Sequence, residues 1–236
     1  MGQISLMKVS GVCAILAGIL GVAGIVVITV GIPDLKSATG ALTYLPILER
    51  NKETIAVGLW LFVLAPLLAI FAGLGFYQAL REGGELMIVA VAMFVIGLLF
   101  IITRGFIELA TVYGLSTGYA AADAGSATRA TLEIVAETFR TLGTLVDLVG
   151  EALSAGIGVL LFSLAILRTS VAPKWIGYLG LVVALVLGWL PLLGPALPVF
   201  KGIGLIGFFA FIVWIVSMGV VLLRQKSESA SAEPSQ

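Results

Sequence analysis

Apolar residues dominate this chain in long runs that are separated by short polar segments. Each run has about the 20 residues or more that an α-helix needs to cross a hydrocarbon core of about 30 Å. The runs that could cross a membrane are residues 9–31, 54–80, 86–113, 131–168, 175–193 and 199–223. The pattern therefore predicts an all-α polytopic membrane protein, a bundle of six transmembrane helices within residues 1–224.

The segments between the runs differ in character. A short apolar stretch at residues 41–48 is expected either to lie on the membrane surface or to fold back over the bundle. Residues 114–131, rich in Gly, Ala, Ser and Thr, predict an extracytoplasmic loop, and residues 194–198 predict a tight hairpin. Pro66 lies in the middle of the second run and predicts a kink. The Ser-, Ala- and Glu-rich residues 225–236 predict a disordered cytoplasmic tail.

The even number of spans places both termini on one side of the membrane. Basic residues are equally numerous on the two predicted sides. On the terminal side they directly adjoin span ends in short loops, whereas on the other side they are mixed with a larger number of acids. Lys and Arg in short loops favour the cytoplasmic side. We therefore expect both termini to be cytoplasmic.

Charged residues follow one face of the fourth predicted helix and its neighbour. The polar positions between residues 133 and 151 are spaced by three or four, so all of them fall within roughly 80° of one another on a helix. These positions are Glu133, Glu137, Arg140, Thr144, Asp147 and Glu151. Arg104 and Glu108 lie four residues apart on the preceding helix. We call the set formed by Arg104, Glu108, Glu133, Glu137, Arg140, Asp147 and Glu151 the charged seam.

The depth of these charges can be counted from the helix ends at Leu86 and Arg168. With a rise of 1.5 Å per residue, Arg104 and Glu151 lie about 27 and 26 Å from those ends. By the same count, Glu108 and Asp147 lie about 33 and 32 Å away. The count predicts an ion pair of Arg104 with Glu151 or with Asp147, near the outer boundary of the hydrocarbon.

Two interpretations of the charged seam remain open. In one, the two helices extend beyond the bilayer and the charges are paired or solvated there. In the other, the charges line a water-filled cavity that is open to the outside, because ionisable residues within a membrane mark functional sites. With five acids and two arginines, such a cavity would favour a cation or protons. The candidate site residues are Arg104, Glu108, Glu137, Arg140, Asp147 and Glu151.

Composition narrows the possible chemistry. The chain has 236 residues, of which 60% are hydrophobic and 11% charged, far from the balance of a soluble domain. Its formal net charge of zero offers no basic surface for a nucleic acid. It contains no histidine and one cysteine, which excludes catalysis by an imidazole group and a disulfide within one chain. Any metal ligands would have to be oxygen atoms, so we expect neither a metal nor a cofactor.

Part of the sequence is similar to a known family. The acidic patch Asp147–Glu151 leads into a Gly-rich apolar run at 156–162, and Ala172-Pro173-Lys174-Trp175-Ile176-Gly177-Tyr178-Leu179-Gly180 follows a short turn. These stretches, with a weaker match at 74–82, resemble a bacterial membrane family catalogued as domain of unknown function 4386. The resemblance implies a bundle of about six spans in a bacterial cytoplasmic membrane and implies no activity. Many members carry a histidine where this chain has acids near Asp147.

These observations lead to two hypotheses for function. The first is a structural or accessory membrane component without catalytic activity, whose partner is the lipid bilayer. The alternative is a small transporter or a binder of a cation or small amphiphile that uses the charged seam. An enclosed pocket that reaches Glu151 would favour the alternative. Continuous helix packing with every charge paired or exposed would favour the first hypothesis.

Overall fold

The computed structural model describes residues 6–38, 40–193 and 203–225. In this part of the chain the regular structure is entirely helical. Six helices are long and apolar enough to cross a membrane: Leu6–Gly31, Lys52–Gly83, Leu86–Ala121, Ala127–Arg168, Lys174–Leu193 and Ile203–Arg224. The predicted bundle of six spans is therefore confirmed. The predicted hairpin at 194–198 and the tail from residue 226 onward lie outside the described residues.

Several spans consist of more than one helical segment. The first, second and last spans are α1 (Leu6–Gly31), α3 (Lys52–Leu80) with the 3₁₀ turn η2 (Arg81–Gly83), and α9 (Ile203–Arg224). The third is α4 (Leu86–Ala110), η3 (Thr111–Leu115) and α5 (Ser116–Ala121). The fourth is α6 (Ala127–Glu151), η4 (Ala152–Val159) and α7 (Leu160–Arg168). The fifth is α8 (Lys174–Val183), η5 (Ala184–Trp189) and η6 (Leu190–Leu193). Segments η3, η4 and η5 are π-helical.

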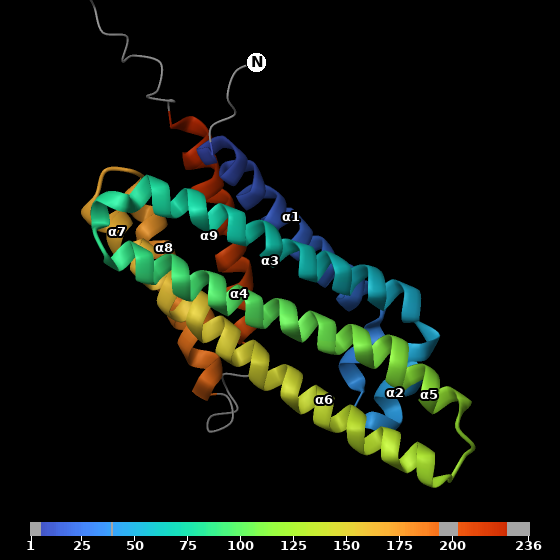
Figure 1. Cartoon of the computed structure of the whole chain (residues 1–236). Coiled ribbons are helices and arrows are strands. Elements are labelled where there is room, and N and C mark those ends of the chain that lie inside the picture. The colour runs from blue at the N-terminus through green and yellow to red at the C-terminus, as the bar shows by residue number, and fades with distance from the viewer. Residues whose placement is uncertain (1–5, 39, 194–202, 226–236) are drawn as a thin grey trace, which may run out of the picture.

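The six spans form a closed bundle in which the first helix packs against the last (Figure 1). A Cβ atom added at Gly11 of α1 would lie 2.8 Å from Leu223 Cγ, and one at Gly21 would lie 3.4 Å from Ile212 Cδ1. The two helices are therefore antiparallel. The beginning of α1 and the end of α9 lie at the same end of the bundle, which we call the terminal end.

An aromatic core fills the half of the bundle nearer the terminal end. Phe76, Phe94, Phe162 and Trp214 come from α3, α4, α7 and α9, and all four are fully buried. The ring of Phe76 lies edge-on to those of Phe162 and Trp214, with centroids 5.8 and 5.5 Å away. Edge-to-face contacts of this kind are favoured by the ring quadrupoles. Four spans are thereby held together at one level.

Small residues let the helix backbones approach closely around this core. A Cβ at Gly150 of α6 would lie 2.9 Å from the Gly97 carbonyl oxygen of α4. In the fifth span, Gly188 packs directly on Gly156, and Trp189 donates its indole N–H to the Gly156 carbonyl oxygen at 3.0 Å. This contact joins the two π-helical segments η4 and η5. Small residues serve the same purpose in many helix interfaces within membranes.

The predicted loop at residues 114–131 is wrong. The third span continues through the π-helical η3 into α5 as far as Ala121, and α6 begins at Ala127. Ser126 caps α6 by accepting a hydrogen bond from the Arg129 N–H at 3.2 Å. Ala, Ser and Thr are compatible with a helix, and the π-turn accommodates Gly114. Composition alone therefore predicts a longer loop than the structure contains.

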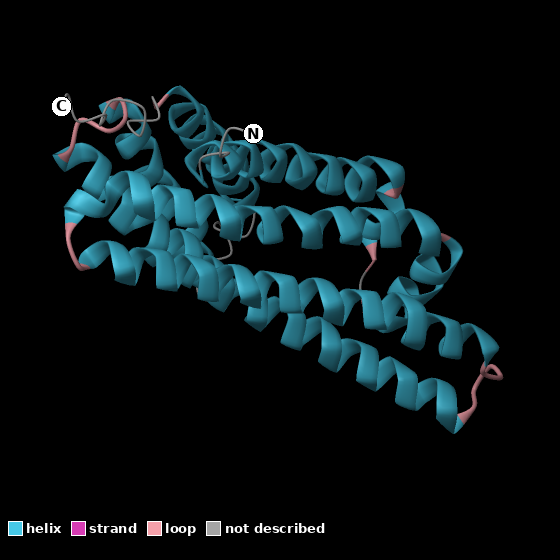
Figure 2. Cartoon of the chain, turned by 45° about the horizontal axis from the view of Figure 1, so that its top comes forward, coloured by secondary structure: helices cyan, strands magenta, loops and turns pink. Residues whose placement is uncertain are grey.

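The third and fourth spans are consequently longer than a bilayer requires. They contain 36 and 42 residues, or about 54 and 63 Å of helix, against a hydrocarbon core of about 30 Å. Figure 2 shows their far ends protruding together from the rest of the molecule, joined by a short loop. The expectation that these two helices extend beyond the bilayer therefore agrees with their lengths.

The apolar stretch between the first two spans folds back over the bundle as α2 (Ala41–Arg50). Leu45 and Leu48 on its inner face are fully buried. Together with Ile32 and Tyr119, among others, they form a second apolar cluster at the end opposite the termini. We call this end of the bundle the α2 end (Figure 1).

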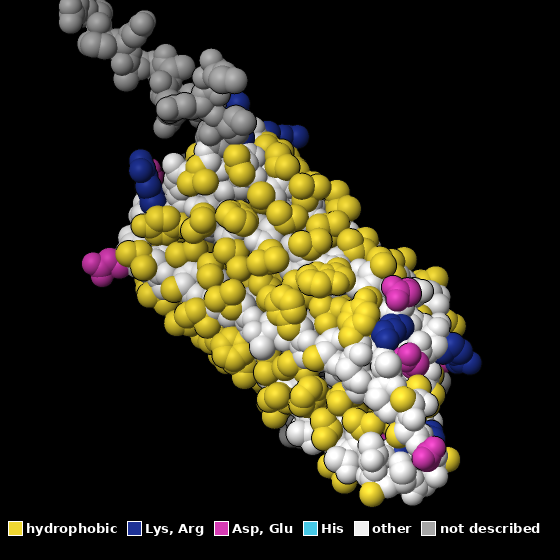
Figure 3. All heavy atoms as spheres, turned by 45° about the vertical axis from the view of Figure 1, so that its right-hand side comes forward, with side chains coloured by type: hydrophobic (Ala, Val, Ile, Leu, Met, Phe, Trp, Pro, Cys, Tyr) yellow, Lys and Arg dark blue, Asp and Glu magenta, His cyan; other side chains and the backbone are white. Residues whose placement is uncertain are grey.

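The surface is consistent with a membrane-spanning bundle. On the face shown in Figure 3, apolar side chains cover the middle of the molecule, and charged side chains gather toward the two ends. Large apolar residues such as Ile19, Phe71 and Ile88 are more than half exposed in this isolated chain. Lipid would cover them, because a spanning helix presents apolar residues to the bilayer.

Candidate binding site in the centre of the bundle

The charged seam does not stay together in the fold. Arg104, Asp147 and Glu151 point into the interior of the bundle, where they border a cavity. Glu108 borders a second cavity below α2. Glu137 and Arg140 form an ion pair with each other on the protruding part of α6, with their side chains nearly half exposed. The structure thus places one part of the set at a cavity and another part in a paired, partly exposed position on α6.

Arg104 and Asp147 form the predicted ion pair across α4 and α6. Counting by helix rise places Arg104 level with Glu151, whereas its actual partner Asp147 lies one helical turn earlier on α6. The two reference ends are not level: a Cβ at Gly83, in the turn before Leu86, would lie 3.5 Å from Ala165 Cβ. The end of α7 at Arg168 therefore projects about one turn beyond that turn.

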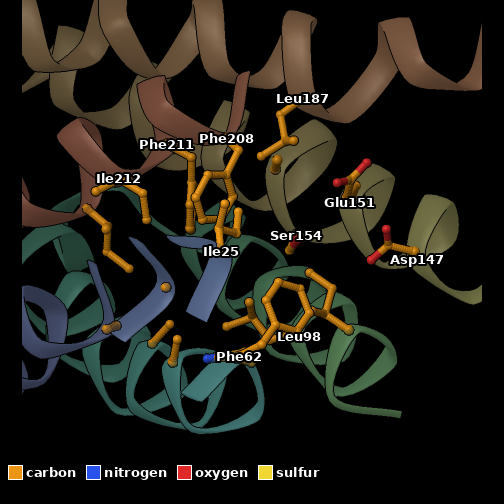
Figure 4. Close-up of a pocket in the computed structure, with 18 of the residues that line it drawn as sticks. Ile25, Phe62, Leu98, Asp147, Glu151, Ser154, Leu187, Phe208, Phe211 and Ile212 are labelled. Carbon is orange, nitrogen blue, oxygen red and sulfur yellow. The ribbon is translucent and has the colours of Figure 1, made fainter. Parts of the chain in front are cut away.

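The central cavity has a volume of about 270 Å³. Side chains from all six spans line it. Its walls are mostly apolar, from Ile25, Phe62, Leu98, Leu187, Phe208, Phe211 and Ile212. Figure 4 shows Asp147 and Glu151 together on one side of the cavity, whereas Phe208, Phe211 and Ile212 lie on another. The cavity is therefore apolar over most of its surface and polar on one wall.

The polar wall contains one cation and two anions. Asp147 is paired with Arg104, whereas Glu151, one turn further along α6, has no cation within 4.0 Å among the described residues. Ser154 completes this wall, and its hydroxyl donates to the Gly150 carbonyl oxygen at 2.7 Å, which leaves its oxygen free to accept. The formal charges of Arg104, Asp147 and Glu151 add up to one negative charge on this wall.

Pro66 leaves a backbone acceptor on α3 without its usual donor. It lies inside the continuous helix α3 and borders the central cavity together with Phe62. Proline has no N–H, so the carbonyl oxygen of Phe62, four residues earlier, lacks its usual helical donor. From the sequence pattern, Pro66 predicts only a kink in this helix. Its position on the cavity wall depends on the tertiary fold.

A second cavity of about 290 Å³ lies between the central cavity and α2. We call it the α2 cavity. Tyr44 of α2 borders it and donates its hydroxyl hydrogen to Glu108 Oε2 at 2.9 Å. Burial and the neighbouring Glu108 raise the pKa of Tyr44 well above its ordinary value, so the phenol stays protonated as a donor. This contact is not predictable from the local sequence pattern, because Tyr44 and Glu108 are 64 residues apart.

The protruding ends of the long helices are held by surface contacts. Tyr119 donates to Glu133 Oε1 at 3.1 Å, and the guanidinium of Arg129 lies 4.1 Å from the centre of the same ring. Glu49 of α2 accepts from Ser116 at 2.8 Å and from Thr117 at 3.0 Å. These polar contacts fix α2 and α5 to α6, and they require no ligand.

Comparison with known proteins identifies a family and nothing finer. The family model described as Domain of unknown function (DUF4386) matches residues 9–225. This match covers all six spans, including Arg104, Asp147 and Glu151. Searches of the curated proteins and of the solved structures gave no match.

Proposed function

The chain belongs to the DUF4386 family, and from that premise we propose that it is an integral membrane protein that binds a small amphiphile in its central cavity and catalyses no reaction. The observation that carries the proposal is one cavity with two kinds of wall. Apolar side chains from every span surround a space that ends at Arg104, Asp147 and Glu151. An amphiphile matches both kinds of wall at once, since its chain packs on the apolar side and its head meets the charges.

The size of the cavity limits the ligand. Its volume of about 270 Å³ is close to the lower end of ordinary ligand pockets and roughly twice that of a cavity that accommodates benzene. A single medium-length alkyl chain or a small ring system with one polar group fits this space. A two-chain phospholipid does not fit in it.

The charges indicate the sign of the head group. Arg104 compensates Asp147, and Glu151 is left without a cation within 4.0 Å in the described part of the chain. An uncompensated carboxylate next to apolar walls within a membrane is unfavourable. A primary ammonium group would compensate Glu151 and could donate further hydrogen bonds to Ser154 and to the Phe62 carbonyl. We therefore propose an amphiphile with a cationic head.

A structural or accessory role without any ligand is the competing proposal. It is favoured by the contacts of the protruding helices, where Glu137 pairs with Arg140 and Glu49 with its hydroxyl donors. Those contacts account for the α2 end as a scaffold. They do not account for an apolar space in the middle of the bundle with an uncompensated acid on its wall.

The two proposals differ in a thermal unfolding experiment on the full chain in maltoside micelles. We expect n-decylamine to raise the unfolding temperature, because a ligand that binds the folded state stabilises it. Decanol and decanoate, at the same concentration, should raise it much less. Glu151→Gln should remove most of the stabilisation by the amine, and the matched variant Glu137→Gln should retain it. Equal stabilisation by the three compounds, or by the amine in both variants, would contradict binding of a cationic head at Glu151. No stabilisation by any of the three would contradict amphiphile binding and leave the structural role.

The orientation is a further part of this proposal. We propose that the terminal end faces the cytoplasm of a bacterium and that the α2 end faces outward across the cytoplasmic membrane. Support comes from the basic residues Arg81, Arg168 and Lys174, which adjoin span ends in the short turns of the terminal end. A cysteine placed at residue 124, between α5 and α6, should react in intact cells with a thiol reagent that does not cross membranes. Reaction only after cell lysis would reverse the orientation.

A further inference from the structure

We propose that the ligand enters the central cavity from the α2 cavity, and that the side chain of Arg104 is the movable partition between the two. This inference rests on the proposed function, since it describes how the amphiphile reaches its site. Arg104 would leave Asp147 for Glu108 as the ligand passes, and the ligand's ammonium group would take its place beside Asp147.

Three residues form the common wall of the two cavities. Ile25, Phe62 and Arg104 border both of them. The Arg104 guanidinium carbon lies 6.0 Å from the centre of the Phe62 ring, at the outer limit of a cation–π contact. Although it lies in the bundle, the Arg104 side chain is 34% exposed. Residues from α1, α3 and α4 therefore lie between the two cavities.

A second partner for Arg104 lies on the side of the α2 cavity. Glu108 is four residues further along α4, which is one turn or about 6 Å toward the α2 end. Its Oε2 atom accepts from Tyr44, so its Oε1 atom can accept from another donor. A Cβ at Gly143 of α6 would lie 3.8 Å from Glu108 Oε1 and 3.9 Å from Arg104 Cγ. Gly143 thus contributes no side chain of its own beside the two groups.

Exchange between the two acids keeps a cation beside Asp147. In the structure, Arg104 pairs with Asp147 and closes the partition. When it turns toward Glu108, Asp147 is left for the incoming ammonium group, next to Glu151. Glu108 then pairs with Arg104 and Asp147 pairs with the ammonium group. This avoids the large penalty of an uncompensated charge in a poorly hydrated site. A neutral or anionic amphiphile offers no such replacement, so the same exchange selects for a cation.

The opposite side of the central cavity is closed. The aromatic core of Phe76, Phe94, Phe162 and Trp214 lies between the cavity and the terminal end, and all four side chains are fully buried. Gly97 and Gly150 bring α4 and α6 into backbone contact beside it. Within the described residues, the aromatic core therefore lies between the central cavity and the terminal end.

The partition can be tested by the reaction of single cysteines with a small cationic methanethiosulfonate reagent. The full chain in lipid nanodiscs, with Cys13→Ser, carries one new cysteine at a time. Ala69→Cys reports on the central cavity, Thr29→Cys on the α2 cavity, and Ala72→Cys on the aromatic core. We expect rapid reaction at Thr29→Cys, slow reaction at Ala69→Cys and none at Ala72→Cys.

Removing the partition should change only the middle position. In the variant Arg104→Ala with Asp147→Asn, which removes both charges of the ion pair together, we expect the rate at Ala69→Cys to rise at least tenfold. The rate at Thr29→Cys should stay within twofold. Glu108→Gln, which leaves the ion pair with Asp147 intact but weakens the second partner, should slow the reaction at Ala69→Cys. This variant also serves as the test if the double variant does not fold.

The outcomes separate this inference from the proposed function. If the rate at Ala69→Cys is the same with and without the Arg104 side chain, or is unchanged by Glu108→Gln, the ligand does not pass Arg104. Entry would then be lateral, past the exposed Leu205 on the cavity wall, and the inference is overturned. Stabilisation by n-decylamine is measured separately on the unmodified chain. Its absence would overturn the proposed function and with it the ligand, whatever the cysteine rates.

Discussion

The two halves of the bundle are built from the same six helices and are packed in opposite ways. Toward the terminal end, Phe76, Phe94, Phe162 and Trp214 interlock and glycines bring backbones into contact. Toward the α2 end, the same spans separate around two cavities of about 270 and 290 Å³. Charged side chains that face the interior, Arg104, Asp147 and Glu151, occur in the open half.

This difference assigns separate tasks to the two halves. Close packing of apolar groups stabilises a membrane bundle, where lipid gives little hydrophobic driving force for helix association. Cavities and inward charges oppose stability, because empty space forfeits contacts and desolvated charges are unfavourable. Cavities and inward charges that are retained together in one half indicate a functional site in that half. We infer that the terminal half is the support and the α2 half is the site.

The largest expected contrast comes from removing one phenylalanine in each half. Phe162→Ala should lower the free energy of unfolding by about 3–5 kcal/mol, because it empties the centre of the aromatic core. Phe208→Ala should lower it by roughly 1–2 kcal/mol, since Phe208 already borders a cavity and is only partly buried. Unfolding in mixed micelles of maltoside and dodecyl sulfate measures both. Equal losses would mean that the two halves are packed alike.

A smaller contrast comes from adding atoms at two alanines that are nearly one turn apart on α3. Ala72→Leu should destabilise the protein by about 1–3 kcal/mol, because Ala72 is fully buried within the aromatic core. Ala69→Leu, which points into the central cavity, should change stability by less than about 0.5 kcal/mol. It should also abolish the stabilisation by n-decylamine, since it occupies the space of the ligand. Retained stabilisation in Ala69→Leu would argue against binding in this cavity.

The smallest effect concerns pH and the surface of the α2 end. Hydrogen bonds from Ser116 and Thr117, with the charge of Lys52, lower the pKa of Glu49 below its usual range. The stability that this contributes is fully present above the unfolded-state pKa and is lost as pH falls through the lower pKa of the folded state. We expect a decrease of about 2 °C or less in the unfolding temperature on acidification, because Glu49 remains partly accessible to solvent.

Two variants check the origin of that acid response. Ser116→Ala and Glu49→Gln should each reduce the dependence of the unfolding temperature on pH below about pH 5, and Phe162→Ala should leave it unchanged. A full acid response in Glu49→Gln would place its source elsewhere. Among the described residues, the core of the terminal half contains no buried acid of this kind.

The sequence predicted the fold well and the site in part. Runs of apolar residues located all six spans, and the four-residue spacing of Asp147 and Glu151 predicted the shared helix face from which both border the central cavity. The ion pair of Arg104 with Asp147 was one of two predicted alternatives. The predicted loop at 114–131 was wrong. Its Gly, Ser and Thr content suggests a loop by composition, but part of this segment forms the helix α5. The contact of Tyr44 with Glu108 joins distant segments and was not foreseen.

The sequence by itself determined that this chain crosses a membrane six times and that its few interior charges lie on two consecutive helices. These properties are local, since hydropathy and helix period depend only on neighbouring residues. Only the tertiary structure decided which charges meet a cavity and which meet each other. The offset of about one turn between the helix ends placed Arg104 beside Asp147, and the fold of α2 placed Tyr44 over Glu108. Such choices depend on how helices far apart in sequence pack, which no local pattern records.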